Sequence, residues 1–365
     1  MVVAANPKAV EAGQQILKKG GNALDAAIAV QMVLSLVEPQ SSGIGGGAFL
    51  LYWDNQNKKL HAYDGRETAP SKAKENRFLL PNGDPQKFYQ AVVGGRSVGV
   101  PGVLGMLDKA HRNHGRTPWS HLFSPSIKLA QEGFNVSPRL QLMLEKDIYL
   151  KNSPTAQTYF YNSDKTPKKY LVNTALAQTF LQLSQSGTRI FYEGALAQAI
   201  VNTVKNAAPP GDLSLLDMKN YRAKSRKPLC RYYRSNTVCS MPPPTSGGIA
   251  ILQLLGILET FDVKNKNPES VEMIHLFTQA QRLAFADRNH FVADSDFVPV
   301  PIRALLDAEY LEKRAQLINM DLDMGKVAPG NPLGRVAYNR DEGEDYSLPS
   351  TSHISIVDGW GNAVS

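Results

Sequence analysis

The strand-forming segments of this chain come in pairs joined by short polar turns, and helical segments separate one pair from the next. The three pairs are residues 48–53 with 59–63, two short runs within 226–241, and 351–358 with the segment that begins at 362. Strands joined by short turns pair antiparallel, whereas a doubly wound parallel sheet needs strict alternation of strand and helix. The order therefore predicts a mixed α+β fold with antiparallel sheets.

The helical segments are marked by local start and stop residues. Within the first 37 residues, Pro7 suits a first helical turn, Gly20 and Gly21 stop that helix, and Asn22 caps a second one with Asp25 three residues on. Most of residues 100–206 is also predicted to be helical. Two further helices are expected at 249–258 and 269–292, the latter with an apolar face formed by Met273, Leu276, Phe277 and Ala280.

Composition excludes some classes of protein. With 365 residues, 42% of them apolar, the chain can form one large core or two. The net charge is +7, but its densest basic stretch, residues 222–234, is interleaved with aromatic residues and indicates a solvated strand face, so we expect no nucleic-acid partner. No run of about 18 apolar residues occurs, so we expect no membrane span.

The two cysteines and the chain ends bear on the compartment. Cys230 and Cys239 flank a predicted hairpin and could form a disulfide across it, although two free thiols fit equally well. Their spacing does not suit a zinc knuckle, and we expect no metal and no cofactor. The chain opens without a signal sequence, which fits either a cytosolic protein or one whose signal was removed. It stops within the predicted strand after 362, and we expect the protein to continue past Ser365.

Two glycine-rich segments are candidate sites. Residues 43–48 match the dinucleotide fingerprint, but they follow a helix and open a strand, which is the reverse of the required context. We therefore reject a dinucleotide site and expect a tight turn that backbone or ligand approaches closely. Residues 241–248 run from three prolines into Thr245, Ser246 and a glycine pair. They could bind an anion at a helix start or simply cap that helix.

Arg66 and Glu67 follow the end of the first predicted hairpin. An arginine there can offer a fork of donors to a carboxylate, which lysine cannot match. An ordinary surface ion pair between Arg66 and Glu67 explains the same residues.

Thr351, Ser352 and His353 begin the last predicted hairpin. On a strand Ser352 and His353 point to opposite faces and cannot easily cooperate, while Thr351 and His353 share a face but have no identifiable third group. A threonine activated by its own α-amine needs no histidine, only cleavage between Ser350 and Thr351. From the residues alone, an ordinary strand threonine fits as well.

Taken together, the motifs of this chain resemble those of the γ-glutamyltranspeptidases, in the same order and along the whole chain. They are residues 20–27, 45–49, 66–70, 98–102, 241–248, 286–288 and 351–353. The resemblance implies an N-terminal-nucleophile hydrolase fold, a four-layer αββα sandwich of two stacked antiparallel sheets. It also implies a precursor that cuts itself at Ser350–Thr351, with residues 1–350 as the large subunit and 351–365 as the start of the small one.

The resemblance also assigns roles to residues. Thr351 would attack the γ-glutamyl amide of glutathione or another γ-glutamyl compound, Arg66 would bind the substrate α-carboxylate, and Glu67 would support Arg66. The remaining substrate-binding residues and the oxyanion glycines belong to the small subunit, so we expect this chain alone to be inactive. We also expect a periplasmic or extracellular location, because the two cysteines favour a protein whose signal was removed. A cephalosporin-type acylase and a non-catalytic binding homologue are the alternatives.

Overall fold

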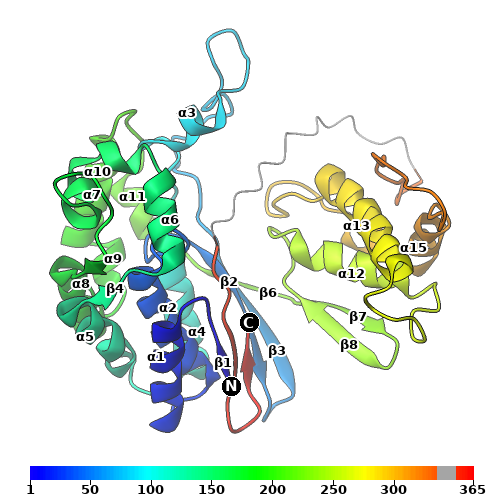
Figure 1. Ribbon diagram of the computed structural model, residues 1–365, viewed down its shortest axis with the longest axis horizontal. Coiled ribbons are helices and arrows are strands. Elements are labelled where there is room, and N and C mark those ends of the chain that lie inside the picture. Colours follow the sequence, from blue (N-terminus) through cyan, green and yellow to red (C-terminus); the bar gives the residue numbers. More distant parts are fainter. Residues whose placement is uncertain (335–350) are drawn as a thin grey trace. The chain divides into compact units, whose positions relative to one another are not determined.

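The computed structural model describes residues 1–334 and 351–365, and they form two compact units (Figure 1). The first unit contains residues 1–225 together with 351–365. The described part of the second unit runs from 226 to 334.

A helical hairpin forms the centre of the first unit, as predicted. Helices α1 (Pro7–Lys18) and α2 (Ala23–Val37) are separated by a turn at Gly20. The Asn22 side chain accepts from the backbone N–H of Asp25, and the Asp25 carboxylate accepts from the backbone N–H of Asn22, which forms a capping box. Every residue of α2 except Gln31 is buried, so α2 is a core helix.

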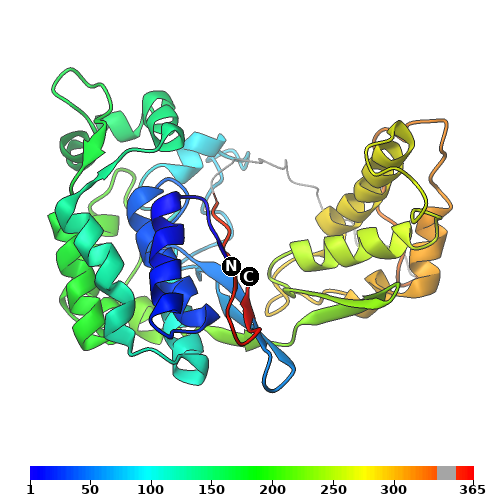
Figure 2. The same cartoon turned by 60° about the horizontal axis from the view of Figure 1, so that its bottom comes forward.

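Six strands form one sheet, and all of their residues except Arg226 belong to the first unit. In spatial order they are β1 (Val2–Val3), β9 (Ser355–Val357), β10 (Ala363–Val364), β2 (Ala48–Asp54), β3 (Lys59–Gly65) and β6 (Lys224–Arg226). The pairings β1–β9, β9–β10, β10–β2 and β2–β3 are all antiparallel, which confirms the prediction. Helices α2 and α4 (Val103–His114) lie on one face of this sheet (Figure 2).

The strand predicted to begin at Thr351 begins at Ser355 instead. Its neighbour β1 offers only Val2 and Val3 as partners, because the chain then turns away into α1. Residues 351–354 therefore approach the sheet without joining it. The sequence also gave no indication of β1 itself, which is two residues long.

The rest of the first unit is mostly helical, as expected for residues 100–206. It contains α3 (Phe88–Val92), η1 (Trp119–Phe123), α5 (Ser124–Glu132), α6 (Pro138–Lys146), η2 (Leu150–Asn152), α7 (Pro154–Phe160), α8 (Thr174–Ser186), α9 (Arg189–Tyr192), α10 (Ala195–Lys205) and α11 (Leu215–Asn220). The only strands there, among the described residues, are β4 (Phe134–Asn135) and β5 (Tyr170–Leu171), which pair with each other. The α+β class is thus confirmed. Of the two stacked sheets expected, the described residues contain one.

The second unit has a core of its own. It comprises β7 (Leu229–Tyr233), β8 (Asn236–Ser240), α12 (Gly247–Leu258), α13 (Val271–Phe291), α14 (Ile302–Leu305) and α15 (Ala308–Ala315). The apolar face predicted for α13 is partly wrong. Leu276, Ala280 and Leu283 are fully buried and form one stripe along the helix. Phe277 lies beside this stripe and is 44% exposed.

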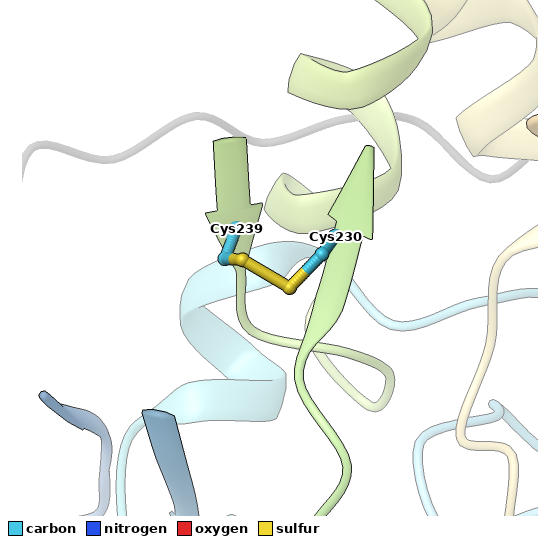
Figure 3. Close-up of a disulfide and its surroundings, with 2 residues drawn as sticks. All are labelled: Cys230 and Cys239. Carbon is cyan, nitrogen blue, oxygen red and sulfur yellow. A yellow bond between two sulfur atoms is a disulfide. The ribbon is translucent and has the colours of Figure 1, made fainter. Parts of the chain in front are cut away.

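Strands β7 and β8 form the hairpin predicted around the two cysteines. Cys230 and Cys239 are directly opposite in the register, with Cα atoms 4.1 Å apart, and a disulfide joins them (Figure 3).

Arginines of the basic stretch are paired with acids: Arg226 with Asp296 at 2.6 Å and Arg231 with Glu259 at 3.5 Å. Among the described residues, no helix is both long and apolar enough to cross a membrane.

Candidate active site

The sheet brings the candidate residues of the first unit to one of its ends. Because β9, β10, β2 and β3 are successively antiparallel, the starts of β9 and β2 lie at the same end as the finish of β3. Thr351 lies just before β9, and Arg66 directly follows β3. Adjacent strands are about 4.8 Å apart, so β9 and β3 are separated by three spacings, roughly 14 Å.

Arg66 is fixed through its backbone. Its N–H donates to Asp64 Oδ1 at 2.9 Å, and its carbonyl accepts from Tyr221 Oη at 2.9 Å. The side chain is 61% exposed, with Nε 3.5 Å from Glu67 Oε2. The surface ion pair that the sequence allowed is therefore present, and most of the guanidinium remains open to a ligand.

The Glu67 carboxylate lies against the glycine-rich turn that precedes β2. A Cβ atom at Gly47 would lie 2.4 Å from Glu67 Oε2 and 2.7 Å from the carbonyl of Gly65, so no other residue fits there without displacing them. The carbonyl of Gly46 accepts from the N–H groups of Gly102 and Val103, at 2.9 and 3.0 Å. The expectation of close approach at this turn is thus confirmed.

Tyr221 is a part of this site that the sequence did not reveal. Its ring stacks on that of Tyr192, with centroids 5.7 Å apart and planes 6° apart. Burial raises the pKa of the Tyr221 phenol, and the nearby negative charges of Asp64 and Glu67 add to this shift. The phenol therefore stays protonated and keeps donating to the Arg66 carbonyl. Tyr221 lies 155 residues from Arg66 along the chain, and no local pattern connects them.

Thr351 is exposed at the start of the segment that leads into β9. His353 Nε2 lies 3.1 Å from Ser355 Oγ, so its contact runs along the chain toward β9. Ser352 Oγ is buried and has no hydrogen-bond partner among the described residues. It lines a pocket of about 90 Å³ beside Gln31 and Phe49. Ser350, the other residue of the expected cleavage site, lies outside the described residues.

The proline–glycine motif at 241–248 lies in the second unit. Ser246 Oγ accepts from Arg288 Nε at 2.9 Å and makes no cap to α12. Thr245 Oγ1 is 3.5 Å from the N–H of Gly247, a long contact for a cap. Asp287 is fully buried, accepts from Tyr310 Oη at 2.7 Å and forms an ion pair with Arg314 Nη2 at 3.2 Å, so it stabilises the unit's interior.

Comparison with known proteins places these residues in a wider context. Residues 9–365 match the family model described as gamma-glutamyltranspeptidase. The whole chain aligns with a glutathione hydrolase proenzyme of Bacillus subtilis at 37% identity over 373 residues. The chain spans 63% of the length of that relative.

Two solved structures have the same fold over almost the whole chain. A γ-glutamyltranspeptidase of Helicobacter pylori superposes with a TM-score of 0.86 at 31% identity, covering 93% of this chain and 97% of that one. A cephalosporin acylase from Bacillus halodurans superposes with a TM-score of 0.82 at 27% identity, covering 100% of this chain and 64% of that one.

Proposed function

Because this chain belongs to the γ-glutamyltranspeptidase family, we propose that it forms most of a precursor that cuts itself before Thr351 and then acts as a γ-glutamyltransferase and glutathione hydrolase. One observation carries the proposal. The antiparallel order of β9, β10, β2 and β3 puts Thr351 and Arg66 at the same end of one sheet, although they are 285 positions apart in the chain.

In the proposed reaction, Thr351 is first released from its peptide bond. Its hydroxyl attacks the carbonyl of Ser350, the bond to the Thr351 nitrogen breaks, and water hydrolyses the resulting ester. Cleavage leaves the α-amine of Thr351 free. An α-amine has a pKa near 8, so roughly a fifth to a third is neutral at physiological pH and can accept a proton.

The free amine then serves as base for the enzyme's own substrate. Thr351 Oγ1 attacks the γ-carbonyl of the γ-glutamyl compound while its proton passes to the α-amine. That proton goes on to the departing amine, and a γ-glutamyl ester remains on Thr351. Water releases glutamate from the ester, or an acceptor amine takes the γ-glutamyl group.

Arg66 supplies the anchor for the substrate in this proposal. Its exposed guanidinium offers paired N–H donors to the α-carboxylate, and its backbone is held by Asp64 and Tyr221. Glu67 limits the motion of the guanidinium through the 3.5 Å contact. The same proposal includes three further parts. Residues 1–350 form the large subunit, the small subunit begins at Thr351, and glutathione is a substrate.

Substitution of Thr351 in the full-length precursor tests the nucleophile. We expect Thr351→Ala to remain a single chain and to release no γ-glutamyl product, and Thr351→Ser to cleave more slowly. His353→Gln is the matched control two positions away, and it should cleave and turn over normally because the base is the α-amine. Mature subunits and normal activity from Thr351→Ala would contradict the proposal, because another residue would then be the nucleophile. A wild-type precursor that neither cleaves nor turns over γ-glutamyl compounds would favour a non-catalytic homologue.

The acylase alternative differs in the substrate group that it recognises. Both a γ-glutamyl amide and a glutaryl amide carry a terminal carboxylate that Arg66 can bind, and the glutaryl amide differs by lacking the α-amine. Relative rates of the wild-type enzyme on the two amides separate the two activities. Faster turnover of the glutaryl amide would favour the acylase, a possibility that the cephalosporin acylase similarity keeps open.

We also propose that the protein works in the periplasm or outside the cell. The Cys230–Cys239 disulfide supports this, because disulfides persist in oxidising compartments. Thiol trapping in intact cells tests it: both cysteines should react with the trapping reagent only after reduction.

A further inference from the structure

Three metal-binding side chains meet at the opposite end of hairpin β2–β3 from Arg66. Asp54 is the last residue of β2, His61 lies near the start of β3, and His114 is the last residue of α4. Strand β2 has seven residues, and at about 3.3 Å per residue this cluster is roughly 20 Å from the end of the sheet at which Arg66 lies. It is therefore separate from the candidate active site.

The strand register explains why the three side chains share one face. Tyr52 is paired with His61, and Asp54 follows Tyr52 by two residues, so both point to the side of the sheet that carries His61. The ring of His114 lies 4.4 Å from that of His61 and 4.7 Å from that of Tyr52, centroid to centroid. One ligand atom from each of Asp54, His61 and His114 can be chosen so that all three lie within 4.8 Å of one another.

A neighbouring tyrosine orients the ring of His114. His114 Nε2 is 2.8 Å from Tyr63 Oη, which also accepts from Asn113 Nδ2 at 3.0 Å. When His114 Nε2 carries the proton and donates it to Tyr63 Oη, Nδ1 is the nitrogen available to a metal. A fixed hydrogen bond from the other nitrogen is the usual arrangement for a metal-binding histidine.

The other two ligands keep binding capacity. The carboxylate of Asp54 accepts from the N–H and the side-chain amide of Asn57, at 3.0 and 2.8 Å, and each oxygen retains a lone pair. Among the described residues, no hydrogen bond to the His61 ring is found.

We propose that Asp54, His61 and His114 bind one divalent transition-metal ion, with zinc as the best match. Two imidazoles and one carboxylate form a donor set that suits zinc and not magnesium or calcium, which prefer oxygen ligands alone. Ligand atoms around tetrahedral zinc are about 3.3 Å apart. The side chains therefore have to close up from the present spacing, which is within 4.8 Å for one nitrogen of each histidine and one oxygen of Asp54. Because Asp54 and both histidines are only partly buried, water can complete the coordination.

The bound ion would add a link between two elements that hydrogen bonds of Tyr63 already connect. It would tie the turn of hairpin β2–β3 to the C-terminal end of α4, where the helix dipole also favours a cation. Lys59 opposes binding, because it is paired with Asp54 in the register and places a positive charge beside the cluster. Removing that charge should therefore strengthen the site.

Zinc titration of the metal-stripped, full-length protein by calorimetry tests the proposal. We expect one ion per chain at about micromolar affinity and a higher Tm with zinc than with EDTA. His61→Gln and His114→Gln should each weaken binding by about tenfold or more, and Tyr63→Phe by about tenfold. His121→Gln, an exposed histidine outside the cluster, is the matched control and should bind like wild type.

Lys59→Gln gives a test that loss of folding cannot imitate, because it should raise zinc affinity severalfold. The Tm of each variant in EDTA shows whether it folds. Wild-type affinity in both His61→Gln and His114→Gln would overturn the proposal by placing the ion elsewhere. So would the absence of binding heat and Tm shift at millimolar zinc. None of these readouts depends on catalysis, so the proposal stands or falls separately from the proposed function.

Discussion

Arg66 is anchored by its backbone while its guanidinium remains in solvent. Asp64 and Tyr221 bond to the N–H and the carbonyl of the same residue, so the direction in which the side chain leaves β3 is set before any substrate binds. A pre-oriented arginine loses less conformational entropy when a carboxylate arrives. Substrate affinity should therefore depend on Tyr221 even though its ring need not touch the substrate.

Tyr221→Phe tests this dependence in the full-length enzyme. The change removes one hydrogen bond to a backbone carbonyl, worth about 0.5–1.5 kcal/mol. We expect KM for the γ-glutamyl donor to rise roughly three- to tenfold with little change in kcat, as measured by steady-state kinetics.

Tyr192→Phe is the matched control for that substitution. Tyr192 donates to the carbonyl of Pro101 and accepts from the N–H of Gly105, each at 3.0 Å, and it stacks on Tyr221. Its loss should lower stability to a similar degree but leave KM nearly unchanged. Equal KM values for wild type and Tyr221→Phe would show that the hydrogen bond does not position Arg66.

Residues differ in how far the sequence alone could identify them. Arg66 could be nominated as a candidate because it lies in a motif shortly after a predicted strand. Tyr221 could not, because its role depends on a contact across 155 positions. The same limit applies to His114 and His61, which only the packing of α4 on hairpin β2–β3 brings together.

At the scale of elements, the turn between β9 and β10 is attached to the start of α2. Asp358 is buried and accepts from the N–H groups of Trp360 and Asn362, each at 2.9 Å, within its own turn. It also accepts from the N–H of Ala23 at 3.0 Å, at the first residue of α2. A carboxylate at this position satisfies a free helix donor and complements the helix dipole.

Asp358→Ala should therefore destabilise the protein. Loss of a buried charged acceptor with several donors costs about 2–4 kcal/mol, and the donors at Ala23 and Asn362 would be left unpaired. Urea unfolding of the uncleaved Thr351→Ala precursor, with and without Asp358→Ala, measures the difference. Asp84→Ala, which removes an exposed turn aspartate, is the control and should change stability by less than about 0.5 kcal/mol. Similar values for the two variants would rule out a special role for Asp358.

Elements with strong local patterns were predictable, and elements defined by distant partners were not. The α1–α2 hairpin carries its own caps, and β2 and β3 carry their own turn, so local residues determine them. Strand β1 is two residues long and exists because β9 pairs with it from the other end of the chain. The start of β9 was predicted four residues too early, and β1 offers it no partner beyond Val3.

At the scale of the whole molecule, the expected cleavage point precedes a strand that is paired on both sides. Strand β9 lies between β1 and β10, and β10 continues to β2. The N-terminal amine of Met1 donates to the carbonyl of Val357 at 2.8 Å, and the carbonyl of Met1 accepts from the N–H of Val357 at 3.0 Å. The sheet would thus contain strands from both products of cleavage.

We expect the two proposed subunits to remain associated after cleavage. They should elute together on gel filtration in buffer and at 1 M salt, and separate only at urea concentrations that unfold the sheet, because strand pairing and apolar burial hold them. Mass spectrometry of the eluted fractions identifies each piece. Separation under native conditions would contradict a sheet shared in this way.

The same strand order predicts that subunits do not exchange between mature molecules. If β9 can leave the sheet only by unfolding, a small subunit remains bound to the large subunit from which it was cut for as long as the protein is folded. Two differently tagged precursors expressed in one cell should yield only parental pairs, and hybrids should form only when the subunits are unfolded and refolded together. Both subunits of each mature molecule would then come from one and the same precursor chain.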